Sequence, residues 1–207
     1  ALSMLLYGLS LYAYGTAYFV VPIFLLGVGV LLWVHRRMEL RQKAGGLVLL
    51  ALTGLPIGLY VAVNRFGWDT LHFGPLSIPR LPATARFTQI FPFFSGTNIY
   101  ENMANNAAAF TRLMIVQEDG NLWNALPQFG FLYLYALPLV LCGLWAVIQE
   151  RQSGGRRFRD NSLFLVWLGA AALLGALIPA NINRINILFI PLIYLEARAL
   201  VFVYDRS

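Results

Sequence analysis

The sequence predicts an all-α, polytopic helical membrane protein with about five transmembrane helices and an extracytoplasmic cap with short helices. Hydrophobic residues make up 59% of the 207 residues, charged residues make up 12%, and the mean hydropathy is +0.67. Soluble domains have about 45–50% apolar and about 25% charged residues, so this chain has too few charges to cover a soluble surface. The formal net charge is +6, but the basic residues stand in short clusters between apolar runs. That pattern favours a membrane protein over a nucleic-acid-binding domain.

Uncharged runs place the expected spans, because about 20 apolar residues cross a bilayer as a helix. Asp, Glu, Lys and Arg are absent from residues 1–35, 44–64, 120–149 and 161–183. Residues 185–204 contain only two charges, Glu196 and Arg198. We therefore expect spans near 15–34, 44–63, 129–148, 162–179 and 186–203. Residues 1–14 are also apolar, and are either the tail of a preceding span or a helix in the membrane interface.

Three parts of the chain follow from these spans: an apolar first segment with two spans (1–63), an extracytoplasmic cap loop (64–128), and three further spans (129–207). The cap is too long for a plain connector, and its many aromatic residues argue against disorder. Its prolines exclude one long helix. A helix is expected over residues 98–116, where apolar residues form one stripe at helical spacing: Ile99, Met103, Ala107, Phe110 and Met114.

Charge placement sets the expected orientation. Segment 35–43 has four basic residues against Glu39, and segment 149–160 has four Arg against two acids. The cap has equal numbers of Arg and acidic residues. The positive-inside rule therefore places 35–43 and 149–160 in the cytoplasm. The cap and the turn 180–185 then lie on the outer face.

Arg184 is the strongest candidate for binding a ligand, because it lies between two expected spans among Asn181, Asn183 and Asn186. An arginine at the membrane is a functional candidate by default, and its guanidinium can hold a phosphate through two parallel hydrogen bonds. The alternative is that Arg184 only extends to lipid headgroups. The three amides either complete a polar pocket or cap the helix expected near Asn186.

Two adjacent acids, Glu118 and Asp119, are weaker catalytic candidates. Neighbouring carboxylates can bind a divalent cation or act as a general base. The alternative is a turn, because Asp119-Gly120 is a strong turn dipeptide. Cys142 is the only cysteine in the chain, which excludes a disulfide framework and a thiolate metal site. We expect no metal site and no cofactor in this chain.

Other candidates lie earlier in the sequence. Arg80 and Arg86 flank Pro82 and either clamp a diphosphate or contact lipid headgroups. Tyr12 and Tyr14 either stack on a sugar or anchor the chain in the interface.

The last expected span carries two charges of its own. Glu196 and Arg198 are two residues apart and do not face each other on a helix. We expect Arg198 to extend into the inner headgroups. Glu196 is expected to pair with another helix or to lie among those headgroups.

Three stretches resemble one family. Residues 8–22 (Gly8-Leu-Ser-Leu-Tyr-Ala-Tyr-Gly-Thr-Ala-Tyr-Phe-Val-Val-Pro22) are similar to the segment of bacterial family-39 glycosyltransferases in which a broken helix enters a span. Residues 117–124 (Gln117-Glu-Asp-Gly-Asn-Leu-Trp-Asn124), followed by Phe129-Gly130 and Tyr133, resemble the end of an outer loop in the Gram-positive members. Residues 181–191 (Asn181-Ile-Asn-Arg-Ile-Asn-Ile-Leu-Phe-Ile-Pro191) resemble a late outer turn that runs into a span. The chain thus resembles the C-terminal membrane portion of a C-fold enzyme of the dolichyl-phosphate-mannose-protein mannosyltransferase type.

The resemblance implies an enzyme of the bacterial cell envelope, in the plasma (inner) membrane, that transfers a sugar from a polyprenyl-phosphate carrier to an extracytoplasmic acceptor. It implies membrane lipid, donor and acceptor as partners, and no nucleic acid. The family's catalytic acid lies in its first outer loop, and no outer acid is expected in residues 1–63. We therefore expect a fragment that is inactive alone, with its catalytic residue unknown. A divalent cation in the full-length enzyme is left open.

Two other classes compete with this interpretation: a portion of a membrane transporter or flippase, and a non-catalytic membrane assembly subunit. Transporters place polar groups at mid-membrane on broken helices. The first four expected spans lack Asp, Glu, Lys, Arg and His, and polar residues gather on the expected outer face, which favours chemistry on a lipid headgroup. Four prolines allow kinks within the expected spans, so the transporter alternative stays open: Pro22, Pro56, Pro138 and Pro191.

Overall fold

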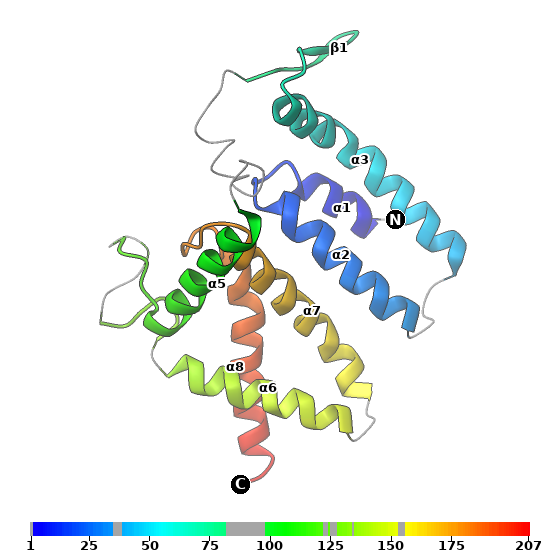
Figure 1. Ribbon diagram of the computed structural model, residues 1–207. Helices are drawn as coiled ribbons and strands as arrows, with labels where there is room; N and C mark the ends of the chain where they lie inside the picture. The colour runs from blue at the N-terminus through cyan, green and yellow to red at the C-terminus, as the bar shows by residue number, and fades with distance from the viewer. Residues whose placement is uncertain are drawn as a thin grey trace. The chain divides into compact units, whose positions relative to one another are not determined.

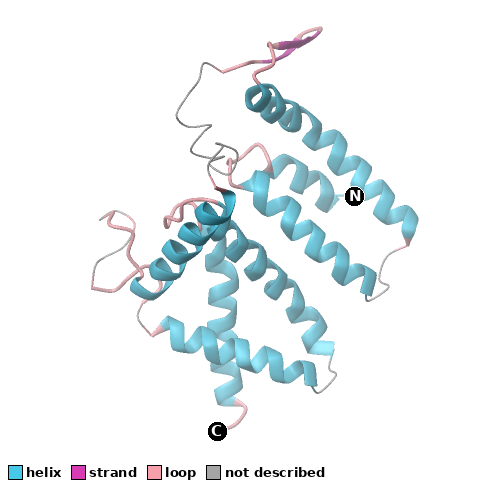
Figure 2. Ribbon diagram, viewed as in Figure 1, coloured by secondary structure: helices cyan, strands magenta, loops and turns pink. Residues whose placement is uncertain are grey.

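The computed structural model describes residues 2–34, 39–81, 98–121, 124, 128–133, 135–152 and 156–207, with no description of the side chains of 151–160. Most of the described chain is helical (Figure 2). It forms two compact units, Ala1–Ser95 and Gly96–Ser207. Arg86 lies outside the described residues.

The first unit contains helices α1 (Leu2–Ser10), α2 (Ala17–Val34) and α3 (Leu40–Phe66) (Figure 1). Helix α1 packs closely on α3 because Gly8 has no side chain: a Cβ atom there would overlap the side chain of Thr53. Helix α3 ends at Gly67, which adopts a left-handed conformation with φ 68° and donates its N–H to the carbonyl of Val63. Glycine is the usual residue at this position because it has no Cβ to clash.

A small β-hairpin follows α3, formed by the antiparallel strands β1 (Leu71–Phe73) and β2 (Leu76–Ile78). The turn begins at Gly74, whose φ is 59°, and two-residue hairpin turns often need such a glycine. Asn64 ties the hairpin to α3: its Nδ2 donates to the carbonyl of Pro79 at 3.1 Å, and its Oδ1 accepts from the N–H of Leu81 at 2.7 Å. The described residues are therefore mostly helical, as predicted, and they include one short hairpin that the sequence did not predict.

The second unit contains helices α5 (Ile99–Val116), α6 (Ala136–Gln152), α7 (Arg156–Leu177) and α8 (Phe189–Tyr204), with a short 3₁₀ turn, η2 (Asn186–Leu188), before α8. Helix α5 confirms the helix expected over residues 98–116. Two glycines permit close helix packing. A Cβ atom on Gly143 of α6 would overlap the carbonyl oxygen of Leu195 in α8, and one on Gly175 of α7 would overlap the ring of Phe110 in α5.

The apolar core of the second unit is built from all four of its helices and the turn before α8. Side chains of α5, α6, α7 and α8 pack against one another in this core. The buried residues that form it are Leu113, Val140, Val147, Ala171, Ile182, Ile185, Leu188, Leu192 and Leu195.

Within the described chain, three helices are long and apolar enough to cross a membrane: Ala17–Val34, Leu40–Phe66 and Asn186–Tyr204. They correspond to the spans expected near 15–34, 44–63 and 186–203. The apolar helices Ala136–Glu150 and Asn161–Leu177 are shorter, so the total of five spans stays a prediction. Helix α1 has nine residues and a length of about 14 Å, less than half of a hydrocarbon core of about 30 Å.

The span expected near 129–148 begins earlier in the sequence than the observed helix does. Helix α6 starts only at Ala136, because two residues just before it adopt positive φ, Gly130 at 68° and Tyr133 at 66°. Such conformations interrupt a right-handed helix. The apolar residues 129–133 therefore belong to a loop and not to the first turns of a span.

Candidate functional site

The candidate site lies where the loop after α5 meets the turn between α7 and η2. We call it the Asp119 junction, formed by Asp119, Asn121, Asn124, Asn181 and Arg184. The backbone N–H of Asn121 donates to Asp119 Oδ1 at 3.0 Å, and Asn124 Nδ2 donates to Asp119 Oδ2 at 2.6 Å. The same Oδ2 accepts from the backbone N–H of Ile182 at 3.1 Å. One carboxylate therefore joins two segments that are 63 residues apart in the sequence.

The hydrogen bonds to Asp119 also set its charge state. Partial burial by itself would raise the pKa of the Asp119 carboxyl. The N–H groups of Ile182 and Asn121 and the amide of Asn124 stabilise the ionised form and outweigh that effect, so the pKa is lowered. A carboxylate held by three donors is a weak proton acceptor. The geometry thus suits Asp119 to fixing the loop, and makes it a poor general base. Its neighbour Glu118 is partly exposed.

Gln117 holds the other side of this loop and was not singled out in the sequence. It ends α5 with a left-handed φ of 60°, and it is fully buried. Its Nε2 donates to the carbonyl of Tyr133 at 3.1 Å, and its Oε1 accepts from the N–H of Leu132 at 3.2 Å. Gly130 packs directly against it, since a Cβ atom at Gly130 would overlap the Gln117 side chain. These partners lie 15 and 16 residues downstream, so no local pattern distinguishes Gln117 from an exposed residue after a helix.

Arg184 lies at the junction, but the three amides do not surround its guanidinium as expected. Asn181 Oδ1 accepts from the backbone N–H of Arg184 at 2.9 Å, which stabilises the turn. The guanidinium Nη1 donates to the carbonyl of Pro179 at 3.2 Å. Asn183 and Asn186 are exposed, and Asn186 is the first residue of η2 while Ile185 occupies the cap position. The guanidinium therefore lies just beyond the end of α7, where carbonyl groups favour a cation.

The earlier candidates belong to the first unit. Arg80 forms an exposed ion pair with Asp69 at 3.6 Å, and its N–H donates to Thr70 Oγ1 at 3.1 Å. Tyr12 donates its hydroxyl to the carbonyl of Thr53 in α3 at 2.9 Å, which ties the segment after α1 to that helix. Tyr14 is exposed.

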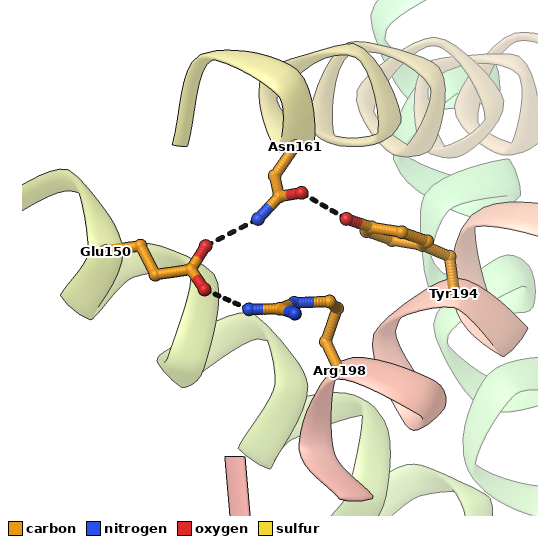
Figure 3. A network of polar contacts seen from close by, with 4 residues as sticks. All are labelled: Glu150, Asn161, Tyr194 and Arg198. Atoms are coloured by element: carbon orange, nitrogen blue, oxygen red, sulfur yellow. Dashed lines mark hydrogen bonds and ion pairs between the residues drawn. The ribbon is translucent and has the colours of Figure 1, made fainter. Parts of the chain in front are cut away.

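A second polar cluster, which we call the Glu150 network, joins three helices of the second unit (Figure 3). Glu150 comes from the end of α6, Asn161 from α7, and Tyr194 and Arg198 from α8. Arg198 Nη2 forms an ion pair with Glu150 Oε1, and Asn161 Nδ2 donates to Glu150 Oε2. Tyr194 donates its hydroxyl to Asn161 Oδ1 and stacks on Phe164 with ring centroids 3.7 Å apart. Arg198 is thus paired with another helix, whereas the sequence suggested that it extends into headgroups.

The Glu150 network is shielded from solvent. The side chains of Glu150 and Arg198 are each only 19% exposed. Among the described residues, Arg198 Nε and Glu196 Oε1 are buried without a hydrogen-bond partner. Burying a charged group costs free energy unless the group is paired and hydrogen-bonded. The ion pair with Arg198 and the hydrogen bond from the Asn161 amide therefore compensate the burial of the Glu150 charge.

In the ranges that the structure describes, no group of three or more His, Cys, Asp or Glu side chains is placed to hold a metal ion. No family model, curated protein or solved structure compared with this chain matches it.

Proposed function

We propose that the chain is part of an integral membrane glycosyltransferase that transfers a sugar from a polyprenyl-phosphate donor to an extracytoplasmic acceptor. The observation that carries the proposal is the hydrogen bond from Ile182 to Asp119. Two of the three stretches that resemble family-39 enzymes, residues 117–124 and 181–191, meet through this bond. Residues with a shared function are expected to lie together in space although they are distant in sequence.

In this proposal Arg184 binds the carrier phosphate. The guanidinium has five N–H donors, and the bond to Pro179 is the contact that fixes its position. The remaining donors suit a phosphate, because the planar fork can form two parallel hydrogen bonds with it. Asp119 then acts indirectly: by holding Ile182 it fixes the turn that carries Arg184.

The proposal leaves the catalytic base outside the Asp119 junction. Proton abstraction is most efficient when the pKa of the base is near the working pH, and the hydrogen bonds to Asp119 move its pKa away from that range. The family resemblance assigns the base to an acidic first outer loop. Residues 1–207 alone should therefore not turn over a lipid-linked sugar, and Glu118 becomes the leading base if they do.

The test measures donor binding and sugar transfer by the full-length parent in nanodiscs, with Arg184→Ala, Arg184→Lys and Arg112→Ala compared. A charge-assisted hydrogen bond is worth about 1.5–3 kcal/mol, so Arg184→Ala should weaken donor binding roughly 10- to 150-fold. Lysine should restore binding only in part, because it keeps the charge and loses the fork. Arg112 is an exposed arginine of α5 and serves as the matched control. Unchanged donor affinity in a folded Arg184→Ala protein contradicts the role given to Arg184.

One observation favours the alternative of a transporter or flippase. The Glu150 network places a largely buried ion pair at the expected cytoplasmic ends of three packed helices, and paired ionisable groups in helical membrane proteins often mark a transport pathway. Reconstituted vesicles distinguish the two functions. Movement of a lipid-linked sugar between leaflets without transfer to an acceptor would support the transporter, and transfer without movement would support the enzyme. An assembly subunit would do neither.

A further inference from the structure

The hairpin after α3 has one apolar face and one polar face. The register pairs Leu71 with Ile78, His72 with Ser77, and Phe73 with Leu76. Because side chains alternate between the two faces of a strand, the first and third pairs share one face, which is wholly apolar. His72 and Ser77 lie on the other face.

In the part of the chain that the structure describes, nothing covers the tip of the apolar face. Phe73 is 54% exposed and Leu76 is 71% exposed. An isolated two-stranded hairpin is marginally stable at best in water, and needs another surface against its apolar face. The hairpin extends beyond the end of α3 (Figure 1), so its apolar face is within reach of whatever surrounds the end of that helix.

A membrane-spanning α3 would place the hairpin at the membrane surface. It has 27 residues, which gives a length of about 40 Å, close to the full thickness of a bilayer with its headgroups. The two Asn64 hydrogen bonds hold the base of the hairpin to the last turns of this helix. At the same level, Phe66 and Trp68 stack with ring centroids 5.3 Å apart and are both exposed. Exposed aromatic rings at the end of a span are typical of the headgroup region.

We propose that the hairpin lies in the lipid–water interface and inserts its apolar face, Leu71, Phe73, Leu76 and Ile78, between the lipids around the end of α3. The lipids of the bilayer itself cover the exposed tip. Apolar side chains on one face and polar ones on the other are the arrangement that interfacial segments use. Arg80, at the base, is exposed and lies where lipid phosphates are found. The proposal requires that α3 crosses a bilayer, and it does not depend on sugar transfer.

The test compares the two faces of one hairpin. Four single-cysteine variants, Phe73→Cys, Leu76→Cys, His72→Cys and Ser77→Cys, are made on a background without the native cysteine and labelled with the environment-sensitive dye NBD. Each is reconstituted in nanodiscs that hold one copy of the chain. Quenching by lipids with a shallow doxyl group reports contact with the bilayer, and quenching by iodide reports contact with water.

We expect the dye at positions 73 and 76 to show blue-shifted emission and doxyl quenching roughly twofold or more above that at positions 72 and 77, because the two pairs lie on opposite faces. Iodide quenching should show the reverse order. Asn64→Ala should reduce the contrast by releasing the base of the hairpin, while helix content stays unchanged. Equal doxyl quenching at all four positions overturns the proposal. The proposal is also overturned if the dye at positions 73 and 76 is shielded from both quenchers, which would indicate that a protein surface covers the tip. It is overturned as well if iodide alone quenches the dye at these positions.

Discussion

Gly143 offers the sharpest test of the packing in the second unit. A Cβ atom at this position would overlap the carbonyl oxygen of Leu195. That obstacle is backbone, which cannot rotate aside as a side chain can, so α6 and α8 must separate when Gly143 becomes Ala. Overpacking of this kind destabilises a protein by about 1–3 kcal/mol. Replacing glycine by alanine inside a helix stabilises the helix by about 0.5–1 kcal/mol and offsets part of that loss. We expect Gly143→Ala to lower the free energy of unfolding by about 0.5–2 kcal/mol.

Gly169 is the matched control, because it lies in α7 of the same unit and a Cβ atom there would meet nothing within 4 Å. Gly169→Ala should therefore be neutral or stabilising by up to about 1 kcal/mol. Both variants are unfolded reversibly in mixed micelles and followed by circular dichroism. If Gly143→Ala is as stable as Gly169→Ala, the close approach of α6 and α8 is wrong. The arrangement of the Glu150 network, which depends on that approach, would then need revision.

Three further predictions concern the polar clusters and the topology. Because the pKa of Asp119 is lowered, its contribution to the free energy of unfolding is present above about pH 4 and is lost as the pH falls through the lower folded-state pKa. The Asp119→Asn variant should be less stable at pH 7 by about 1–2 kcal/mol, and its stability should depend less on acid pH. An acid dependence identical to that of the unmodified protein would contradict the role of the Asp119 hydrogen bonds. In a double-mutant cycle, Glu150→Ala and Arg198→Ala should show a coupling energy of about 1–2 kcal/mol, whereas additive losses would mean that the ion pair contributes nothing. An impermeant thiol reagent applied to intact cells should label a cysteine at position 70 and leave one at position 155 unlabelled, and the opposite pattern would reverse the proposed topology.

Local sequence patterns were sufficient for the long helices. Hydrophobic length is a property of the segment itself, so α2, α3 and α8 could be located from long apolar runs with few charges. Helix α5 could be located from apolar residues at helical spacing, and Phe110 of that stripe packs against Gly175 of α7. Asp119-Gly120 indicated a turn, and the Asp119 carboxylate does accept from the N–H two residues later, which is a local Asx interaction.

The hairpin was missed although a signal for it was present. Its strands have three residues each, too few for alternation to stand out from an apolar run. The dipeptide Gly74-Pro75 marks a turn, but the polar anchor that fixes the hairpin to α3 is Asn64. An asparagine near the end of a long helix gives no local sign of the segment that it will bind.

Tertiary structure alone decided which polar groups meet. Helical spacing correctly indicates that residues two apart, such as Glu196 and Arg198, point in different directions, but it cannot name a partner on another helix. Glu150 reaches Arg198 across 48 residues and Asp119 reaches Ile182 across 63. Both contacts exist because apolar packing of the second unit brings the ends of distant segments together, and a buried charge is tolerated only where that packing also delivers its partner. The sequence by itself determined where helices form, since that depends on neighbouring residues. Their packing determined what Gln117 holds and which charges are paired.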